Sequence, residues 1–358
     1  MTGPRRVRRA RAVLVAWCER KLVLLNYQTL VSVSADPEAV RLLHLLEDWT
    51  RPSDLSALLP EYSPGSIRAG VRELLSQTFL VAEGTPEARR DADLTSVWSA
   101  WLPEASFHFA TKDVEYVQPP SRLFRRYLAE SSQPPLLKNY GKAHRVELPT
   151  QKRADSQFEQ VLLARRTHRE FSRKRVPLRV ISTLLQYTWG VTGRIDAPPF
   201  GRLFHKTSPS GGARHPGEVY LLAMRVEGLA QGLYHYNCLH HRLERLRSLA
   251  AAPKALAYTA GQEFVGDASA LFIMTAVFPR VLWKYRFARS YRVVLLDAGH
   301  LCQTFCLVAT WLGLAPFCTA AFEDSLIERD LGLDGIRESG IYVAGVGTPL
   351  EGRVRSRR

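Results

Sequence analysis

Paired cysteines are missing from this sequence of 358 residues. Its five cysteines are spread along the chain, and none forms a Cys-x-x-Cys pair: Cys18, Cys238, Cys302, Cys306 and Cys318. The pattern indicates neither a disulfide framework nor a zinc site, so we predict no bound metal. Reduced thiols of this kind are typical of a cytoplasmic protein, which is the location that we expect.

A signal peptide and a clear membrane span are missing as well. The arginine-rich start is followed by an apolar run of only Val13 to Trp17, which is too short for the core of an export signal. Leu301 to Phe322 carries no charge and is nearly long enough to cross a bilayer, but Gly313 and Pro316 interrupt it. We therefore predict a buried central helix in a protein without membrane contact.

Acidic residues are in deficit, since 34 Asp and Glu stand against 49 Lys and Arg and give a formal net charge of +15. This balance suits a nucleic acid, an acidic peptide or a phosphorylated cofactor, and it does not choose among them. Much of the excess lies at the two ends, Arg5–Arg11 and Arg353–Arg358, where basic tails are usually solvated. With 46% hydrophobic residues, the chain is expected to form one large domain and one smaller one.

Residues 1–84 have the pattern of a winged-helix-like domain. Asp36 before Pro37 marks the start of the first of three helices, and Ser53 and Ser66 are candidate caps for the other two. The third helix has two arginines and a glutamate, which is a poor basic face for a DNA groove, so we expect a peptide or partner docking domain instead. The expected strands are Leu22–Leu25, Leu30–Val33 and Phe79–Val81.

Two further regions follow this domain. Residues 85–155 are rich in proline, serine and scattered aromatics, with little periodicity, and we predict a connecting region that wraps over one of the domains. Residues 156–358 alternate helical and strand patterns, which indicates an α+β catalytic domain. The expected helices are 158–166, 177–187 and 293–312, and the expected strands are 219–224, 232–236, 271–276 and 341–346.

A basic cluster and a glycine loop in this domain could bind a phosphorylated, planar ligand. Three guanidiniums and a hydroxyl within five residues offer the charged donors that a phosphate needs. Paired glycines further on allow the backbone to approach a flat ligand closely. Alone, each segment is as readily a solvated basic cluster or a surface turn. The residues are Arg165, Arg166, Thr167 and Arg169 in the cluster, and Pro209, Ser210, Gly211, Gly212 and Arg214 in the loop.

Two later segments complete the set. Lys284-Tyr285 gives two groups that could move protons, and the small residues of Thr319-Ala320-Ala321 suit a flat cofactor beside a strand. In the long helix between them, Asp297 is expected to be a partner or cap for nearby arginines. By itself, each of these features is more often a matter of packing.

The order and spacing of the four segments resemble the nitroreductase family, and more closely its SagB-type branch, the azoline dehydrogenases. Three strings look like signatures of that branch: Ser208 to Tyr220, Gly228 to Tyr236 and Tyr291 to His300. The resemblance covers about residues 96 to 349. It implies an α+β nitroreductase-like fold with a central antiparallel sheet flanked by helices, FMN as the cofactor, and a homodimer with each flavin site at the subunit interface.

The resemblance also implies roles by position. The basic cluster matches the contacts to the FMN phosphate and ribityl chain, although Thr167 replaces the more usual serine. The glycine loop matches the contact to the isoalloxazine, with Arg214 at the pyrimidine edge, and Thr319-Ala320-Ala321 matches the loop near the reactive edge. Arg353 or Arg355, in the tail, is expected to reach the phosphate.

The implied chemistry is the desaturation of an azoline ring to a thiazole or oxazole. Lys284, in its neutral form, would remove a proton while hydride passes to the flavin, and Tyr285 would orient the ring or relay the proton. The implied substrate is a heterocycle-containing peptide or a carrier-bound equivalent, made with a cyclodehydratase or synthetase partner. Two alternatives stay open: a nitro or quinone reductase or other flavin desaturase, and, less favoured, a winged-helix regulator that binds nucleic acid.

Overall fold

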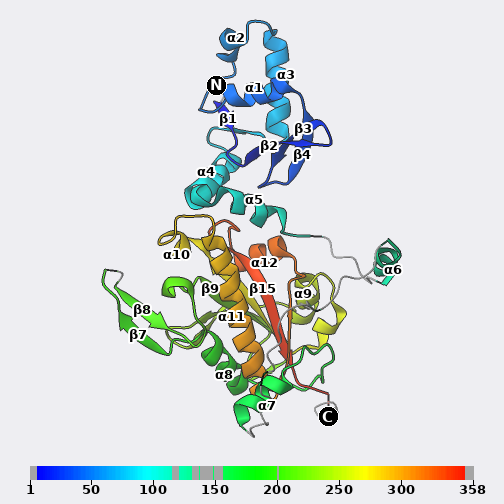
Figure 1. Ribbon diagram of the computed structural model, residues 1–358, viewed down its shortest axis with the longest axis vertical. Helices are drawn as coiled ribbons and strands as arrows, with labels where there is room; N and C mark the ends of the chain where they lie inside the picture. Colours follow the sequence, from blue (N-terminus) through cyan, green and yellow to red (C-terminus); the bar gives the residue numbers. More distant parts are fainter. Residues whose placement is uncertain are drawn as a thin grey trace.

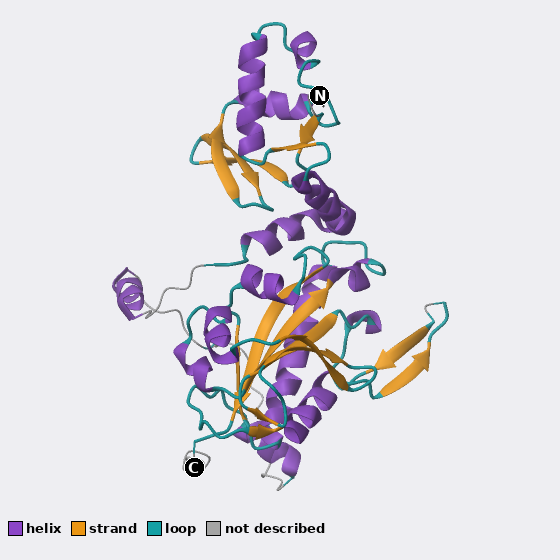
Figure 2. Ribbon diagram, turned by 180° about the vertical axis from the view of Figure 1, so that it is seen from behind, coloured by secondary structure: helices purple, strands orange, loops and turns teal. Residues whose placement is uncertain are grey.

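The computed structural model describes residues 6–114, 121–130, 137, 148, 156–199 and 201–350. A small N-terminal unit stands apart from a larger α+β domain, and two helices, α4 and α5, lie between them (Figures 1 and 2). Arg353 and Arg355, which were expected to reach the phosphate, lie outside the described residues.

The N-terminal unit is a three-stranded antiparallel meander followed by three helices. Its strands are β2 (Val13–Cys18), β3 (Lys21–Asn26) and β4 (Val31–Ala35), and its helices are α1 (Pro37–Leu45), α2 (Leu55–Leu58) and α3 (Pro64–Ser76). The returning strand β5 (Leu80–Ala82) pairs with β1 (Val7–Arg9) and not with the meander. A core of leucine, valine, isoleucine and phenylalanine side chains holds the unit together. The order of helices was predicted, but β1 and β2 were missed.

The helix starts in this unit are set by side-chain caps. Asp36 accepts a hydrogen bond from the amide of Ala39 at the start of α1, as predicted. The expected caps of the other two helices are wrong. Ser63, not Ser66, caps α3, and it accepts from the Ser66 amide, because Pro64 already occupies the first helical position. α2 begins without any side-chain cap.

Residues 85–110 are helical, so the prediction of an irregular connecting region is wrong there. They form α4 (Pro86–Trp98), the 3-10 turn η1 (Ser99–Trp101) and α5 (Leu102–Ala110), followed by α6 (Ser121–Glu130). Trp98 and Trp101 are fully buried and pack against Tyr27 of the N-terminal unit and Phe278 of the larger domain. Pro119-Pro120 and Pro134-Pro135, in the rest of the region, lie outside the described residues.

Polar groups reinforce this junction. His108 of α5 is buried, and its Nδ1 lies 2.9 Å from the hydroxyl of Tyr291 in the larger domain. Burial lowers the pKa of His108 to about 3, so the imidazole is neutral at ordinary pH. Lys112 forms a buried ion pair with Glu328 at 2.6 Å. The segment after α4 therefore belongs to the larger domain by its contacts.

The larger domain is built on one six-stranded antiparallel sheet in the order β12-β11-β9-β13-β15-β14. Several strands extend beyond their predicted ends, and β12 and β14 were missed. The sheet strands are β9 (Gly217–Ala223), β11 (Gly232–Asn237), β12 (Arg242–Arg247), β13 (Ala270–Val277), β14 (Ala315–Thr319) and β15 (Glu338–Gly347). Outside it are the parallel pair β6 (Val176–Pro177) and β10 (Val226–Glu227), and the hairpin β7 (Gly193–Asp196) and β8 (Arg202–His205).

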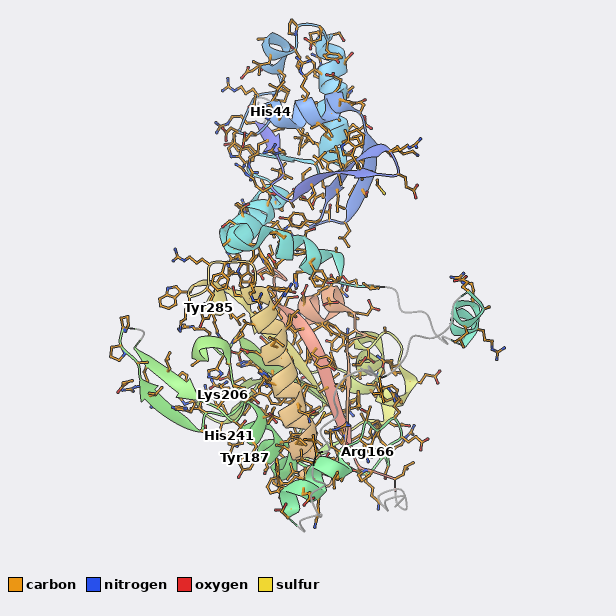
Figure 3. The ribbon with its side chains drawn as sticks, viewed as in Figure 1. His44, Arg166, Tyr187, Lys206, His241 and Tyr285 are labelled. Carbon is orange, nitrogen blue, oxygen red and sulfur yellow. The ribbon has the colours of Figure 1, made fainter. Side chains whose placement is uncertain are left out.

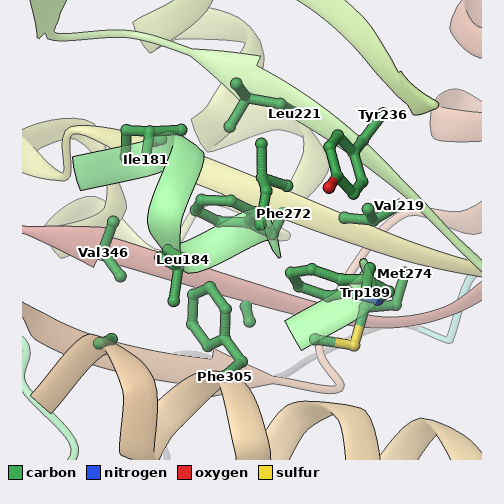
Figure 4. Close-up of a cluster of buried hydrophobic side chains, with 14 of the residues drawn as sticks. Ile181, Leu184, Trp189, Val219, Leu221, Tyr236, Phe272, Met274, Phe305 and Val346 are labelled. Atoms are coloured by element: carbon green, nitrogen blue, oxygen red, sulfur yellow. The ribbon is translucent and has the colours of Figure 1, made fainter. Parts of the chain in front are cut away.

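Helices cover both faces of this sheet. On one face lie α8 (Leu178–Trp189) and α11 (Ser290–Trp311), and Trp189 stacks on Phe272 with ring centroids 5.9 Å apart (Figure 4). On the other face lie α9 (Ala251–Tyr258) and α12 (Asp324–Leu331). Successive side chains of the central strands serve opposite faces, as the period of a strand requires. The remaining elements are α7 (Gln157–Ala164), α10 (Phe278–Leu282), η2 (Gly211–Ala213) and η3 (Glu263–Asp267).

The long apolar stretch is divided between a helix and a strand. α11 ends at Trp311, Gly313 takes a positive φ of 72°, and Pro316 lies within β14. Among the described residues, α11 is the one helix that is long and apolar enough to cross a membrane by length and composition. Its side chains Phe305 and Ala309 are fully buried against the sheet. One face of the helix therefore packs in the core of the domain.

Candidate functional site

The glycine loop is held on α11 by a buried carboxylate. Asp297 accepts hydrogen bonds from the Ser210 hydroxyl at 2.5 Å and from the Gly211 amide at 3.3 Å. Burial raises the pKa of Asp297, although both of these hydrogen bonds oppose the effect. The expectation that Asp297 is a partner or cap for nearby arginines is wrong, because its carboxylate oxygens accept hydrogen bonds from the glycine loop instead. The same Ser210 hydroxyl accepts from the His215 amide at 2.9 Å, which closes the loop.

The Lys-Tyr pair lies against this loop. Lys284 and Tyr285 occupy the turn between α10 and α11, and both are partly buried (Figure 3). A Cβ atom added to Gly212 would lie 2.3 Å from the Tyr285 hydroxyl oxygen and 2.8 Å from Lys284 Nζ. Gly212 also has a φ of 61°, which other residues rarely adopt. The absence of a side chain at Gly212 therefore makes room for both functional groups.

Arg214 is held at the same end of the domain. Its Nε donates to the carbonyl oxygen of Arg280 at 3.1 Å, and its guanidinium carbon lies 5.0 Å from the centre of the Trp283 ring. Arg280 in turn pairs with Glu218 at 2.6 Å. These contacts fix the arginine beside the Lys-Tyr turn and the glycine loop.

The basic cluster follows the end of α7. The amide of His168 donates to the carbonyl oxygen of Pro316 at 2.9 Å, which anchors the cluster to β14. Arg166 donates to two backbone carbonyls, and Arg169 lies 5.9 Å from the Phe264 ring centre. Within the described part of the chain, Arg165, Arg166 and Arg169 form no ion pair with a carboxylate. Their charge is thus available to an anion such as a terminal phosphate.

The loop after β14 is shaped by a residue that the sequence analysis missed. Gln262, between α9 and η3, donates from Nε2 to the Thr319 hydroxyl at 3.0 Å and to the Ala321 carbonyl oxygen at 2.9 Å. The Ala321 amide donates to the Thr319 hydroxyl at 3.0 Å. Gln262 lies in a short loop with no motif around it, so the sequence held no signal for this role.

Most of the predicted site residues fall into two groups along α11. The glycine loop and the Lys-Tyr pair lie near its N-terminal end, whereas the basic cluster lies toward its C-terminal end, beside Pro316. The Thr319 loop lies between these ends, because β14 runs back along the helix from Ala315 to Thr319. Arg166 and Tyr285 are accordingly far apart in Figure 3. A helix of 22 residues is about 33 Å long. One chain therefore brings the proton-moving pair to the loop, but it does not bring that pair to the basic cluster.

The chain belongs to the nitroreductase family, whose sequence model matches residues 162–348. It is similar to the trifolitoxin-processing protein TfxB of Rhizobium leguminosarum bv. trifolii, with 37% identity over 46% of this chain and 45% of TfxB. The match thus spans less than half the length of that relative.

One further similarity supports the SagB-type branch that the sequence suggested, and another concerns the fold. The microcin B17-processing protein McbC of Escherichia coli is 29% identical over 49% of this chain and 68% of McbC. A chain of the E. coli microcin synthetase McbBCD complex, solved with truncated pro-MccB17 bound, covers 73% of this chain and 97% of its own length. The TM-score is 0.53 and the identity 21%, so this likeness concerns the fold. The expected antiparallel fold with flanking helices is confirmed.

Proposed function

We propose that the chain is an FMN-dependent dehydrogenase that oxidises azoline rings, in a peptide or on a carrier, to thiazoles or oxazoles. The observation that carries the proposal is the position of Lys284 Nζ and the Tyr285 hydroxyl beside Gly212, in the loop expected to face the isoalloxazine. TfxB and McbC are named as proteins that process trifolitoxin and microcin B17, which supports a substrate of that kind. A cyclodehydratase or synthetase partner would supply the azoline.

The residues present fit FMN. The glycine loop holds Lys284 Nζ and the Tyr285 hydroxyl against its backbone at Gly212. Among the described residues, no carboxylate pairs with Arg165, Arg166 or Arg169, so these guanidiniums offer their charge to one terminal phosphate. When bound, FMN supplies the acceptor for a hydride. Lys284 accepts the ring proton at Nζ, and Tyr285 orients the ring through its hydroxyl. Arg214 would place positive charge at the pyrimidine edge of the flavin, where negative charge develops when the flavin is reduced.

A direct assay separates this proposal from a nitro or quinone reductase. The protein is mixed without oxygen with a synthetic thiazoline-containing peptide, and the flavin absorbance is followed. We expect the peptide to bleach the flavin and to lose two hydrogens by mass, whereas NAD(P)H reduces the flavin only slowly. Rapid reduction by NAD(P)H, with no reaction of the thiazoline, would establish the reductase instead.

The purified protein is expected to be yellow and to contain non-covalent FMN. Arg169→Ala should weaken FMN binding about 10-fold to 100-fold, because a hydrogen bond to a charged group contributes about 1.5–3 kcal/mol. Titration of the apoprotein with FMN measures the change, and excess FMN should restore part of the turnover. Arg173→Ala is the control, since Arg173 is exposed and pairs with Asp267 at 2.8 Å. Extraction of FAD, or no flavin after reconstitution, would refute the assignment.

The proposed enzyme is a homodimer. Large apolar side chains are exposed on α7 and α11, among them Phe158 (68% exposed) and Leu296 (60% exposed). Gly299, on the same face of α11 as Leu296, has no atom of another element near its missing Cβ, so a second helix could approach closely there. Pairing two copies across this face could bring the proton-moving group of one chain to the basic cluster of the other, which supports a shared site.

Leu296→Glu should therefore convert the dimer to a monomer and release FMN. A buried, unpaired carboxylate in an interface costs several kcal/mol, which is enough to dissociate most dimers at micromolar concentration. Sedimentation velocity measures the mass. Leu239→Glu, at a position that is 46% exposed in the turn between β11 and β12, is the matched control and should remain dimeric. A stable wild-type monomer that still holds FMN would contradict the proposal.

The N-terminal unit is proposed to dock an extended segment of the peptide substrate. A cavity of about 380 Å³ lies between β4 and the helices α1 and α3, and β4 is an edge strand with a free side. Asp36, Glu38 and Glu73 line the cavity, and among the described residues no lysine or arginine does. The acidic lining of the cavity contrasts with the net charge of +15 of the whole chain. It favours a segment with apolar and basic side chains that pairs with β4 as an additional strand.

A pair of labelled peptides tests the docking proposal. A decapeptide of alternating leucine and lysine should bind, as measured by fluorescence anisotropy, and one of leucine and glutamate should not. Gly70→Leu fills the cavity from α3 and should abolish binding, whereas Gly65→Leu on the same helix lies outside it. Equal binding of the two peptides, or unchanged binding to Gly70→Leu, would show that this groove is not the docking site.

A further inference from the structure

Three cysteines meet at one point beside the sheet. Cys302 and Cys306 lie one turn apart on α11, and Cys318 lies on β14. Their three sulfur atoms all lie within 4.8 Å of one another. Cys302 and Cys306 are buried and Cys318 is partly buried. The sequence analysis expected no such cluster, because spacing along the chain did not show that β14 returns alongside α11.

The separation of these sulfur atoms suits a metal ion. A zinc–sulfur bond is about 2.3 Å long, so sulfur atoms that share one ion lie about 4 Å apart. The upper limit of 4.8 Å in the cluster is compatible with that distance. We propose that Cys302, Cys306 and Cys318 bind one soft metal ion, Zn²⁺ or Cu⁺, through their three sulfur atoms. Soft thiolate ligands select these ions over magnesium, calcium or manganese.

The surroundings of the cluster support bound thiolates. The Tyr342 hydroxyl donates a hydrogen bond to Cys318 Sγ at 3.2 Å, and such a bond to a ligating sulfur orients it. Arg165 is near enough to act electrostatically on Cys306 and Cys318, and its positive charge offsets the excess negative charge of three thiolates around one ion. Cys302 and Cys306 are buried and belong to the same hydrophobic cluster as the central strands, so the site is set in the core.

The role of such an ion would be structural. It would join α11 to β14 at Cys318, and Thr319, the next residue, begins the loop that Gln262 holds. The ion would thus fix the end of β14 where the proposed flavin contact starts. This inference does not depend on azoline chemistry, because it concerns metal content and not turnover.

Metal analysis of the full-length protein tests the inference. Protein purified under reducing conditions, without a metal-affinity tag, is analysed by plasma mass spectrometry, which also tells zinc from copper. We expect about one ion per chain. X-ray absorption at the edge of that metal should show sulfur neighbours at about 2.3 Å. Cys302→Ser and Cys306→Ser should each lower the metal content at least about tenfold, and Cys238→Ser, outside the cluster, should not.

Three results would overturn the inference, and none depends on a variant's folding alone. The first is wild-type protein that contains no zinc or copper and takes up neither Zn²⁺ nor Co²⁺ after reduction. The second is an absorption spectrum of bound metal without sulfur neighbours. The third is an intact mass that lacks two hydrogens because Cys318 is joined to one of its neighbours in a disulfide. Loss of FMN with the metal retained would count only against the proposed flavin function.

Discussion

Lys284→Ala is expected to lower azoline oxidation by about 100-fold to 10,000-fold, which is the usual cost of losing a general base. The flavin spectrum and the dimer should remain, because Lys284 lies in the turn before α11, next to Tyr285, which is far from Arg166 of the basic cluster in Figure 3. Stopped-flow bleaching of the flavin by a thiazoline peptide measures the step that the substitution affects. The result separates the proposed base from a residue that only supports the fold.

Two companion variants sharpen this experiment. Tyr285→Phe should cost less than Lys284→Ala if the hydroxyl only orients the ring, and about as much if it relays the proton. Lys254→Ala removes a lysine on the opposite face of the sheet, where it pairs with Asp330 at 2.6 Å, and should leave turnover unchanged. Near-normal activity of Lys284→Ala on a verified azoline would mean that the assigned base is wrong. The enzyme would then be a reductase or an oxidase of another kind.

The sequence was informative where function depends on contiguous residues. The glycine loop and the Lys-Tyr pair are each read from a few adjacent residues, but their contact at Gly212 is seen only in the structure. The central strands were also predictable, because strands buried on both faces appear as short apolar runs. The ends of the strands were less predictable, since β15 begins at Glu338, three residues before the apolar segment that predicted it.

The misses share a physical cause, which is that they depend on contacts between distant segments. In the sequence, Trp98 and Trp101 are two of several scattered aromatic residues. In the structure, they are buried between the N-terminal unit and the larger domain. Gln262 acts through its amide on a loop almost 60 residues away along the chain. Asp297 was expected to bind arginines because these are its sequence neighbours, but it accepts a hydrogen bond from Ser210 of the glycine loop. The periodicity of apolar residues in a sequence shows which face of a helix or strand is buried, but it does not show which other segment packs against that face.

Gly212→Ala is expected to lower turnover about 100-fold while the protein remains folded. The new methyl group would lie 2.3 Å from the Tyr285 hydroxyl and 2.8 Å from Lys284 Nζ, so both groups must move. A displacement of about 1 Å at reacting groups can cost about 100-fold in rate. The displaced groups lie at the loop that is proposed to face the flavin ring, so FMN affinity is measured together with the rate of flavin bleaching at saturating FMN.

Gly332→Ala is the matched control, because Gly332 also has a positive φ, of 75°, but no atom lies near its missing Cβ. In both variants, alanine at a positive φ destabilises the folded state by roughly 1 kcal/mol, but only Gly212→Ala places a methyl group against the Lys-Tyr pair. The double variant Gly212→Ala/Tyr285→Phe removes the oxygen nearest the new methyl group. Its loss of rate should therefore be smaller than the product of the two single losses, since the two sites are in contact. If the losses multiply, or if Gly332→Ala is as slow as Gly212→Ala, backbone strain and not contact with the pair explains the need for glycine.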